Sequence, residues 1–231
     1  ETPIFPISIF KVKEGINYNK EDPSYDLFRL ACRVSAKRLF PNFSFLDSSF
    51  NKKFLVEGDY TTEVGYMGCR TRVLANVCGP SVTPGRGNLS FTSINLPRIG
   101  INHGICLGER DKADMKGFYE ELDETIELVK GQLLQRFECQ CSKSRANFKF
   151  LLGSGVWINS EKMDYKTKLR TVLKHGTLSI GFIGLAETLK ALIGEHHGES
   201  EKAQKLGLEI IGHIRKKCDE YCDEYNLNFT C

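Results

Sequence analysis

The stretch Asn88-Leu89-Ser90-Phe91-Thr92-Ser93-Ile94-Asn95-Leu96-Pro97 decides the fold of this 231-residue chain. Apolar and polar residues alternate along it, as in a strand with one buried face, until Pro97 stops the pattern. Residues 111–137 follow a different period, because their apolar side chains recur at steps of three and four residues. That spacing is typical of an amphipathic helix. The two segments together predict a sheet that is covered by helices.

The rest of the chain extends this order of strands and helices. Apolar periodicity predicts helices over residues 22–40, 179–193 and 199–225, and strands over residues 53–57, 71–75, 148–152 and 226–231. Strands separated by long amphipathic helices favour an α/β fold with a mostly parallel sheet and outer helices, such as a portion of an α/β barrel. We expect residues 1–231 to be a single domain or a fragment of one. The apolar half-strand at the end needs a neighbour, which indicates a cut chain.

Composition narrows the class of protein. Apolar residues make up 41% of the chain, which is enough for a core, and the net charge is only +3. This near balance implies no broad basic surface for nucleic acid. No apolar run approaches the roughly 18 residues of a membrane span, and the first residues lack the basic start of a signal peptide. We therefore expect a cytoplasmic protein with no nucleic-acid or membrane partner.

The chain has nine cysteines. An odd number without regular spacing argues against a secreted disulfide framework and favours a reducing compartment. The pairs Cys139-x-Cys141 and Cys218-x-x-x-Cys222 lack the second ligand pair of a structural zinc site, so we predict no metal site. Cys218 and Cys222 lie one helical turn apart and are interpreted as small buried hydrophobes.

Cys69 is the candidate catalytic residue. In Met67-Gly68-Cys69-Arg70-Thr71, a glycine directly before the cysteine allows a tight turn that presents the thiol at a loop tip. Polar residues some twenty positions later, including Asn88, can return to face it. The pattern alone leaves alternatives open, because most free cysteines are buried structural thiols and Asn88 also suits a turn.

Two glycine-containing segments are candidates for phosphate contacts. Gly176-Thr177-Leu178-Ser179 is the stronger one because it precedes the helix predicted over residues 179–193, and the first amides of a helix favour anions. Helix capping by Thr177 or Ser179 explains the same residues equally well. Gly85-Arg86-Gly87 is the weaker candidate. No P-loop or dinucleotide-binding fingerprint is present.

Four motifs together resemble one enzyme family. They are Tyr66-Met67-Gly68-Cys69-Arg70-Thr71-Arg72-Val73, Gly87-Asn88-Leu89-Ser90, Ser93-Ile94-Asn95-Leu96-Pro97-Arg98 and Ser179-Ile180-Gly181-Phe182-Ile183-Gly184-Leu185. The chain is similar over nearly its whole length to the anaerobic (class III) ribonucleoside-triphosphate reductases, which are glycyl-radical enzymes.

The resemblance implies an active cysteine on an internal finger loop of an α/β barrel. Cys69 would be the thiyl cysteine that removes the 3′ hydrogen of the ribose, and Asn88 a substrate-facing amide beside it. Met67, Gly176, Thr177 and Ser179 complete the expected substrate-binding set. The reaction would reduce ribonucleoside triphosphates to deoxyribonucleoside triphosphates for DNA synthesis. No metal is expected in this chain.

The resemblance also implies cofactors and partners outside the chain. Formate is the expected reductant, a glycyl radical would lie outside residues 1–231, and a separate radical-SAM activase with an iron-sulfur cluster would generate it. The family's ATP-regulatory and glycyl-radical regions are absent here. The full-length protein is expected to be a homodimer, and this chain to be a central fragment of the barrel that is inert alone.

Two other functions remain as alternatives at this point. One is a glycyl-radical enzyme of the formate-lyase type, although that family often has two adjacent cysteines on this loop, whereas Cys69 stands between Gly68 and Arg70. The other is a noncatalytic binding domain, which a buried Cys69 without an adjoining cavity would favour.

Overall fold

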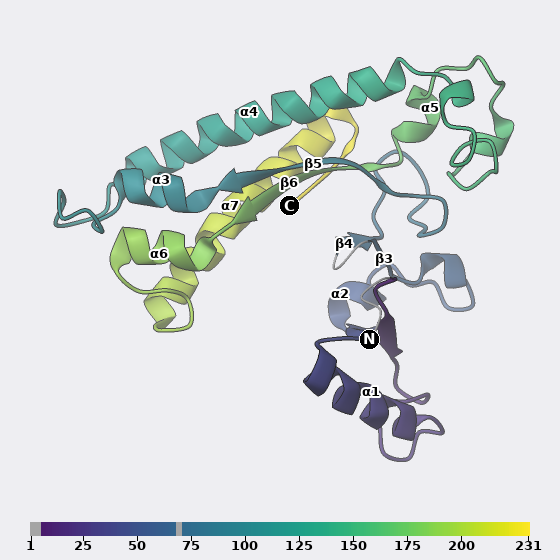
Figure 1. Cartoon of the computed structure of the whole chain (residues 1–231), viewed down its shortest axis with the longest axis horizontal. Helices are drawn as coiled ribbons and strands as arrows, with labels where there is room; N and C mark the ends of the chain where they lie inside the picture. The colour runs from purple at the N-terminus through teal and green to yellow at the C-terminus, as the bar shows by residue number, and fades with distance from the viewer. Residues whose placement is uncertain (1–5, 68–70) are drawn as a thin grey trace. The chain divides into compact units, whose positions relative to one another are not determined.

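The computed structural model describes residues 6–67 and 71–231, and these residues form two compact units that divide between Arg86 and Gly87. Figure 1 labels the helices and strands of both units. Among the described residues, no helix is both long and apolar enough to cross a membrane.

The first unit contains two small sheets. Strand β1 (Ile9–Val12) pairs in parallel with β2 (Asn42–Phe45), and helix α1 (Tyr25–Arg38) connects them. Strand β3 (Gly65–Met67) pairs antiparallel with β4 (Thr71–Val73). The short helix α2 (Ser49–Lys52) and a 3-10 turn (Tyr60–Thr62) lie between the two sheets in sequence. The small apolar core beside β3 consists of Leu46, Val64 and Leu74.

The sequence prediction for this unit is partly confirmed. Helix α1 and strand β4 form where the pattern placed them, but the strand expected over residues 53–57 is wrong. The amides of residues 53–55 donate to carbonyls of residues 49–52 instead, which continues the turn of α2. Backbone groups satisfied so locally cannot join a strand ladder.

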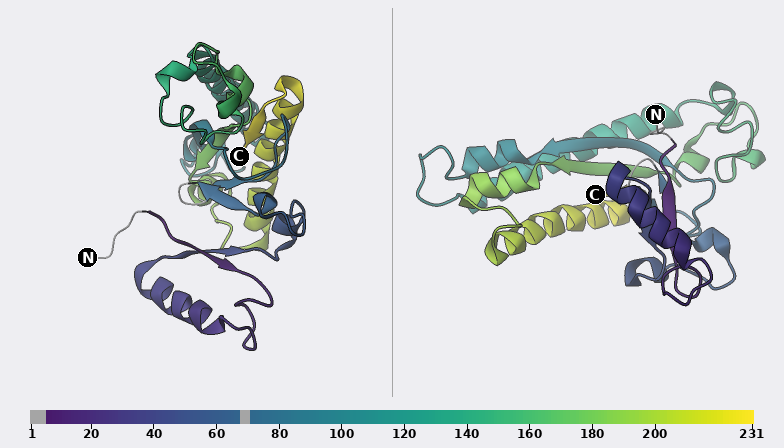
Figure 2. Two further views of the ribbon diagram at one scale, coloured as in Figure 1. Left: turned by 90° about the vertical axis from the view of Figure 1, so that its right-hand side faces the viewer. Right: turned by 60° about the horizontal axis from the view of Figure 1, so that its bottom comes forward.

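The second unit is built on a three-stranded parallel sheet. Its strand order is β5 (Asn88–Asn95), β6 (Thr177–Ile183) and β7 (Asn228–Thr230). Helices α4 (Met115–Cys141) and α7 (Glu201–Tyr225) run lengthwise along the sheet, as Figures 1 and 2 show. Strand β7 confirms the half-strand expected at the end of the chain, and β6 is its neighbour.

The core of this unit lies between the sheet and the two long helices. Helix α4 supplies a completely apolar stripe, which consists of Phe118, Leu122, Ile126, Val129, Leu133, Phe137 and Cys141. Ile94, Leu178 and Ile180 of the sheet and Ile210 and Ile214 of α7 pack into the same cluster. Polar contacts join the two helices at its edge, where His213 binds Asp123 at 2.6 Å and Tyr221 donates to Glu127.

Two further helices form where the strands end. Helix α3 (Leu96–His103) begins directly after β5, with Pro97 in its first turn and the Asn95 side chain accepting from the Arg98 amide at 3.3 Å. Pro97 therefore ends the strand by beginning a helix, which suits a residue without an amide hydrogen. Helix α6 (Leu185–Ile193) follows β6 and packs against α3.

The helix predicted over residues 179–193 is wrong in its first half. Residues 177–183 are strand β6, which is hydrogen-bonded to β5 on one side and β7 on the other. Gly181 permits this pairing, since a Cβ there would lie 2.8 Å from the Ser93 hydroxyl oxygen. The helix begins only after Gly184, whose φ of 74° breaks the strand.

The strand predicted over residues 148–152 is also wrong. Residues 142–169 consist of turns and two 3-10 helices, Arg145–Asn147 and Ser160–Lys162, and the short helix α5 (Arg170–Leu173) follows them. The Leu152 amide donates to the Phe148 carbonyl at 3.0 Å, which is a local turn contact. The fold is thus mixed α/β with mostly parallel small sheets, and none of the sheets among the described residues closes into a barrel.

Candidate functional site

The candidate site begins with the antiparallel pair β3 and β4, which flank residues 68–70 in the sequence. Gly65 pairs with Val73, Tyr66 with Arg72, and Met67 with Thr71. Met67 is half-buried at the end of β3. Cys69, the predicted catalytic residue, lies outside the described residues, so its role stays a prediction.

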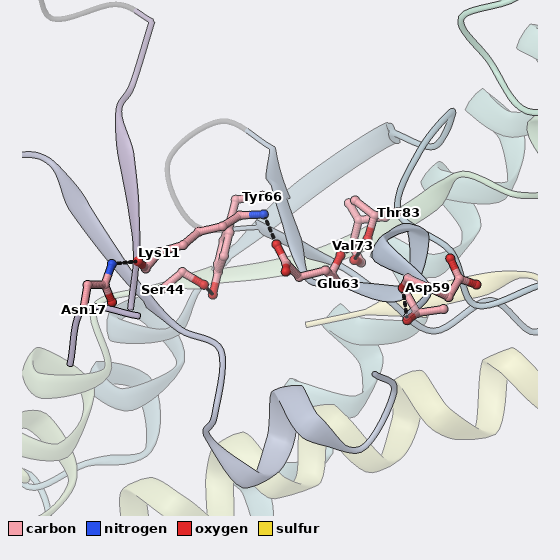
Figure 3. A network of polar contacts seen from close by, with 9 residues as sticks. Lys11, Asn17, Ser44, Asp59, Glu63, Tyr66, Val73 and Thr83 are labelled. Atoms are coloured by element: carbon pink, nitrogen blue, oxygen red, sulfur yellow. Dashed lines mark hydrogen bonds and ion pairs between the residues drawn. The ribbon is translucent and has the colours of Figure 1, made fainter. Parts of the chain in front are cut away.

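Thr83 links strand β4 to the residues just before β3. Its hydroxyl donates to the Glu63 carbonyl at 2.6 Å and lies 3.2 Å from the Val73 carbonyl. Gly65 lies so close to Thr83 that a Cβ would be 2.1 Å from the threonine methyl carbon. Figure 3 shows this contact network, in which Lys11 also forms an ion pair with Glu63.

Side chains from α2 and β2 contact the middle residues of the same strands. Ser44 of β2 donates to the Tyr66 hydroxyl at 3.2 Å, and Arg72 donates to Asn51 at 3.0 Å. The Arg72 guanidinium also lies 4.6 Å from the centre of the Phe50 ring. Polar contacts therefore add to the small apolar core in positioning the pair β3 and β4.

Arg86, from the weaker phosphate candidate Gly85-Arg86-Gly87, has a structural position. Its side chain is buried and donates to the Leu74 carbonyl at 2.8 Å and to the Val82 carbonyl at 3.4 Å. Burial lowers the pKa of this guanidinium. Because these contacts hold the residues after β4, the interpretation of this arginine as a phosphate ligand is not supported.

A separate candidate region, within the unit Gly87–Cys231, is a row of polar residues at the starts of the three parallel strands. Asn88 pairs with Thr177, and Thr177 pairs with Asn228. The Thr177 hydroxyl donates to Asn88 Oδ1, although these residues lie 89 positions apart in the sequence. The structure therefore brings together two of the predicted site residues.

Asn228 is the member of this row that sequence reasoning missed. It is buried, and its Nδ2 donates to the Lys174 carbonyl at 3.1 Å and to the Gly176 carbonyl at 3.4 Å. These bonds fix the turn that leads into β6. The sequence signal that could have indicated Asn228 is a polar residue at the start of an apolar half-strand. Its neighbours, however, are known only from the order of the strands in the sheet.

Gly176 and Ser179 have positions that differ from the prediction. Both were expected just before or at the start of a helix, but Gly176 precedes a strand and Ser179 lies inside it. A Cβ on Gly176 would lie 2.5 Å from Leu89 Cγ, so the glycine permits close packing of β5. The helix-terminus argument for phosphate binding therefore fails here.

One face of the parallel sheet carries polar and exposed side chains. Leu178, Ile180 and Phe182 of β6 belong to the core, so the alternate residues Ser179, Gly181 and Ile183 lie on the other face. Their register partners on β5 are Phe91, Ser93 and Asn95, and Phe91 is 69% exposed. Asn88 is exposed at the beginning of this strand.

Fold and site together define a mixed α/β protein that carries a polar row on a parallel sheet and a separate strand pair around a Gly-Cys motif. A family model described as "Anaerobic ribonucleoside-triphosphate reductase" matches residues 1–231. The chain therefore belongs to the anaerobic ribonucleoside-triphosphate reductase family, an enzyme family.

Curated relatives agree with this assignment. The chain is 30% identical over 238 residues to the anaerobic ribonucleoside-triphosphate reductase of Escherichia coli (strain K12), with 100% of this chain and 31% of the relative covered. It is 30% identical over 233 residues to the enzyme of Enterobacteria phage T4, covering 99% of this chain and 35% of the relative. The chain thus spans about a third of the length of the curated relatives it matches.

A solved structure supports the fold. The anaerobic ribonucleotide reductase from Thermotoga maritima, crystallised with MES in the active site, matches with a TM-score of 0.52 and 17% identity, covering 97% of this chain and 32% of that one. The family match selects this family over the formate-lyase type that the sequence left as an alternative.

Proposed function

We propose that the full-length protein reduces ribonucleoside triphosphates to deoxyribonucleoside triphosphates by thiyl-radical chemistry. Residues 1–231 would form the central part of its catalytic α/β barrel. The observation that carries this proposal is the family match over all 231 residues, which include the Gly68-Cys69 motif. The names of the relatives describe the same activity.

Cys69 is proposed as the residue that removes the 3′ hydrogen of the ribose. Hydrogen transfer requires near contact between the sulfur and C3′, in a site that excludes water. The Thr83 and Arg72 contacts of β3 and β4 support this role, because they hold the strands that flank the motif. Met67, half-buried beside the motif, is proposed to contact the substrate.

Asn88 is proposed to bind the ribose hydroxyls. Its Oδ1 accepts from Thr177, so the two hydrogens of Nδ2 remain for a ligand. A fixed amide donor can stabilise charge that develops as the 2′-hydroxyl leaves as water. In this proposal Thr177 orients the amide, Ser179 faces the substrate from the uncovered side of the sheet, and Gly176 permits the approach of Leu89.

The remaining parts of the proposed reaction lie outside residues 1–231. A glycyl radical would generate the thiyl at Cys69, with formate as the reductant. A radical-SAM activase with an iron-sulfur cluster would form that radical, and the full-length protein would act as a homodimer. Alone, the 231-residue chain is expected to be inert.

The test compares two cysteine variants of the full-length protein under anaerobic conditions with activase, formate and a ribonucleoside triphosphate. Cys69→Ala is expected to abolish deoxynucleotide formation while the glycyl radical signal in electron paramagnetic resonance persists. Cys106→Ala, which removes an exposed cysteine, is the control and should keep the activity. Product formation by Cys69→Ala would refute the assignment.

A second variant tests Asn88. Replacing it with Ala should lower kcat by about 10²–10³-fold, the range for loss of one preorganised donor. Asn102→Ala, which removes an amide bound to Glu121 on α4, should leave kcat unchanged. Normal kcat in Asn88→Ala would remove the residue from the proposed site.

A further inference from the structure

The strand that carries Asn88 is irregular at its start. From one register pair to the next, β5 advances two residues, from Asn88 to Ser90, whereas its partner β6 advances only one, from Thr177 to Leu178. Leu89 is therefore an additional residue between two pairs, as in a β-bulge. A bulge interrupts the alternation of side chains between the two faces of a strand and can redirect a side chain.

The bulge decides which face of the sheet Asn88 occupies. Asn88 and Phe91 are three positions apart and would lie on opposite faces of a regular strand. Their register partners, Thr177 and Ser179, are two positions apart on β6 and share its uncovered face. Asn88 therefore lies on the same uncovered face as Phe91, whereas Leu89 packs against the apolar cluster. The additional residue thus turns Asn88 toward the side of the sheet that is proposed to bind the substrate.

Gln140 of helix α4 holds the backbone of the bulge. Its Nε2 donates to the Leu89 carbonyl at 3.2 Å. One turn earlier on the same helix, Arg136 donates to the Phe91 carbonyl at 3.1 Å, which holds the regular part of β5. The Leu89 side chain packs over Gly176, where a Cβ would lie 2.5 Å from the leucine Cγ. The bulge is thus fixed by α4 through its backbone and by the turn before β6 through its side chain.

We propose that Gln140 is a positioning residue of the reductase, because it fixes the bulge at Leu89 and thereby sets the direction of the Asn88 amide. This inference rests on the proposed role of Asn88 at the ribose hydroxyls. On the other side of Asn88, the Thr177 amide donates to the Gly87 carbonyl at 3.0 Å. Both neighbours of Asn88 are therefore held. A donor that acts in a transition state needs such fixed geometry, since a displacement of about 1 Å can lower a rate about 10²-fold.

The first test replaces Gln140 in the full-length protein with Met or Glu, neither of which donates to a carbonyl at neutral pH. In the part of the chain that the structure describes, the buried Gln140 Oε1 has no hydrogen-bond partner, so Met removes the donor without breaking a second bond. Hydrogen exchange should increase in the peptide that covers residues 87–92 and stay unchanged in α7. Unchanged exchange at residues 87–92 in both variants would overturn the proposal.

The second test measures kcat with activase, formate and a ribonucleoside triphosphate in a double-mutant cycle. Gln140→Met and Gln140→Glu should each lower kcat by about 10–10²-fold. In the Asn88→Ala background, the same substitutions should have no further effect, because the amide that Gln140 positions has been removed. A loss of folded protein would instead lower kcat equally in both backgrounds.

Gln132→Met is the matched control, because it changes an exposed glutamine two turns earlier on α4. It should alter neither the exchange of residues 87–92 nor kcat. Normal kcat in the Gln140 variants, or an equal fall in both backgrounds, would overturn this inference alone. Normal kcat in Asn88→Ala would overturn the proposed role of Asn88 and the inference with it.

Discussion

The two units hold their candidate regions, the strand pair β3–β4 and the polar row on the parallel sheet, by different forces. In the first unit, three buried apolar residues form the core beside β3. Thr83 and Ser44 donate side-chain hydrogen bonds to the strand pair and its flanks, and Asn51 accepts one from Arg72. In the second unit, an extensive apolar cluster holds the sheet against α4 and α7. Each large side chain buried in the apolar cluster contributes several kcal/mol, whereas a polar contact contributes about 1 kcal/mol and fixes a specific geometry. We expect substitutions in the two units to differ in how much they change the free energy of unfolding and in how many elements they affect.

The largest expected effect lies in the apolar cluster. Leu122→Ala removes a fully buried side chain on α4 and should lower the free energy of unfolding by about 2–5 kcal/mol, measured by urea denaturation. Leu128→Ala changes a 65%-exposed leucine of the same helix and should alter it by less than about 0.5 kcal/mol. Equal losses would show that burial on α4 does not stabilise the unit.

The next effect tests the close packing in the first unit. Gly65→Ala places a Cβ 2.1 Å from the Thr83 methyl carbon and should destabilise the strand pair by about 1–3 kcal/mol. Hydrogen exchange should increase in β3 and β4 and stay unchanged in α4. Gly131→Ala, in open space on α4, should have the opposite sign and stabilise by up to about 1 kcal/mol.

Sequence reasoning succeeded where a pattern was long. Helices α4 and α7 and strand β5 were predicted because 8 to 27 residues repeat one period. Strands β1 and β2, with four residues each, were not predicted, whereas the three-residue strands β4 and β7 were. Strand β6 was mistaken for part of a helix because its apolar residues continue into those of α6.

Sequence motifs could predict only those residues of the candidate site that lie within them. Cys69 and Asn88 were selected by neighbouring residues, and the link between Asn88 and Thr177 follows from parallel pairing. Asn228 was missed because its partners, Lys174 and Gly176, are more than fifty positions away. The phosphate argument for Gly176 depended on a helix that begins several residues later.

A substitution with a smaller expected effect tests the polar contacts of the first unit. Thr83→Val removes the hydroxyl that binds the Glu63 carbonyl but keeps the side chain's shape, and should cost about 0.5–1.5 kcal/mol. Thr171→Val, at an exposed threonine in α5, is the control. If both variants unfold at the wild-type urea concentration, this hydrogen bond does not stabilise the strand pair.

The smallest effect concerns an ion pair at the edge of the second unit. Hydrogen bonds from Lys130 and Tyr221 lower the pKa of Glu127 below its ordinary value of 4.5. A lowered carboxyl pKa contributes stability at neutral pH, and this contribution disappears as the pH falls through the folded-state pKa.

Glu127→Gln should therefore be less stable than wild type at pH 7, and the difference should shrink as the pH falls below about 4.5. Thermal unfolding across this range measures it. Glu120→Gln, at an exposed position of the same helix, serves as the control. A difference that grows on acidification would contradict the assigned contacts.

The most direct test of the proposed active site is a crystal structure of the full-length protein with a bound ribonucleoside triphosphate. The Cys69 sulfur should lie about 3–3.5 Å from C3′ of the ribose, with the Asn88 amide bound to a ribose hydroxyl. If Cys69 and Asn88 instead face separate, solidly packed regions, the thiyl-radical assignment of these residues is wrong.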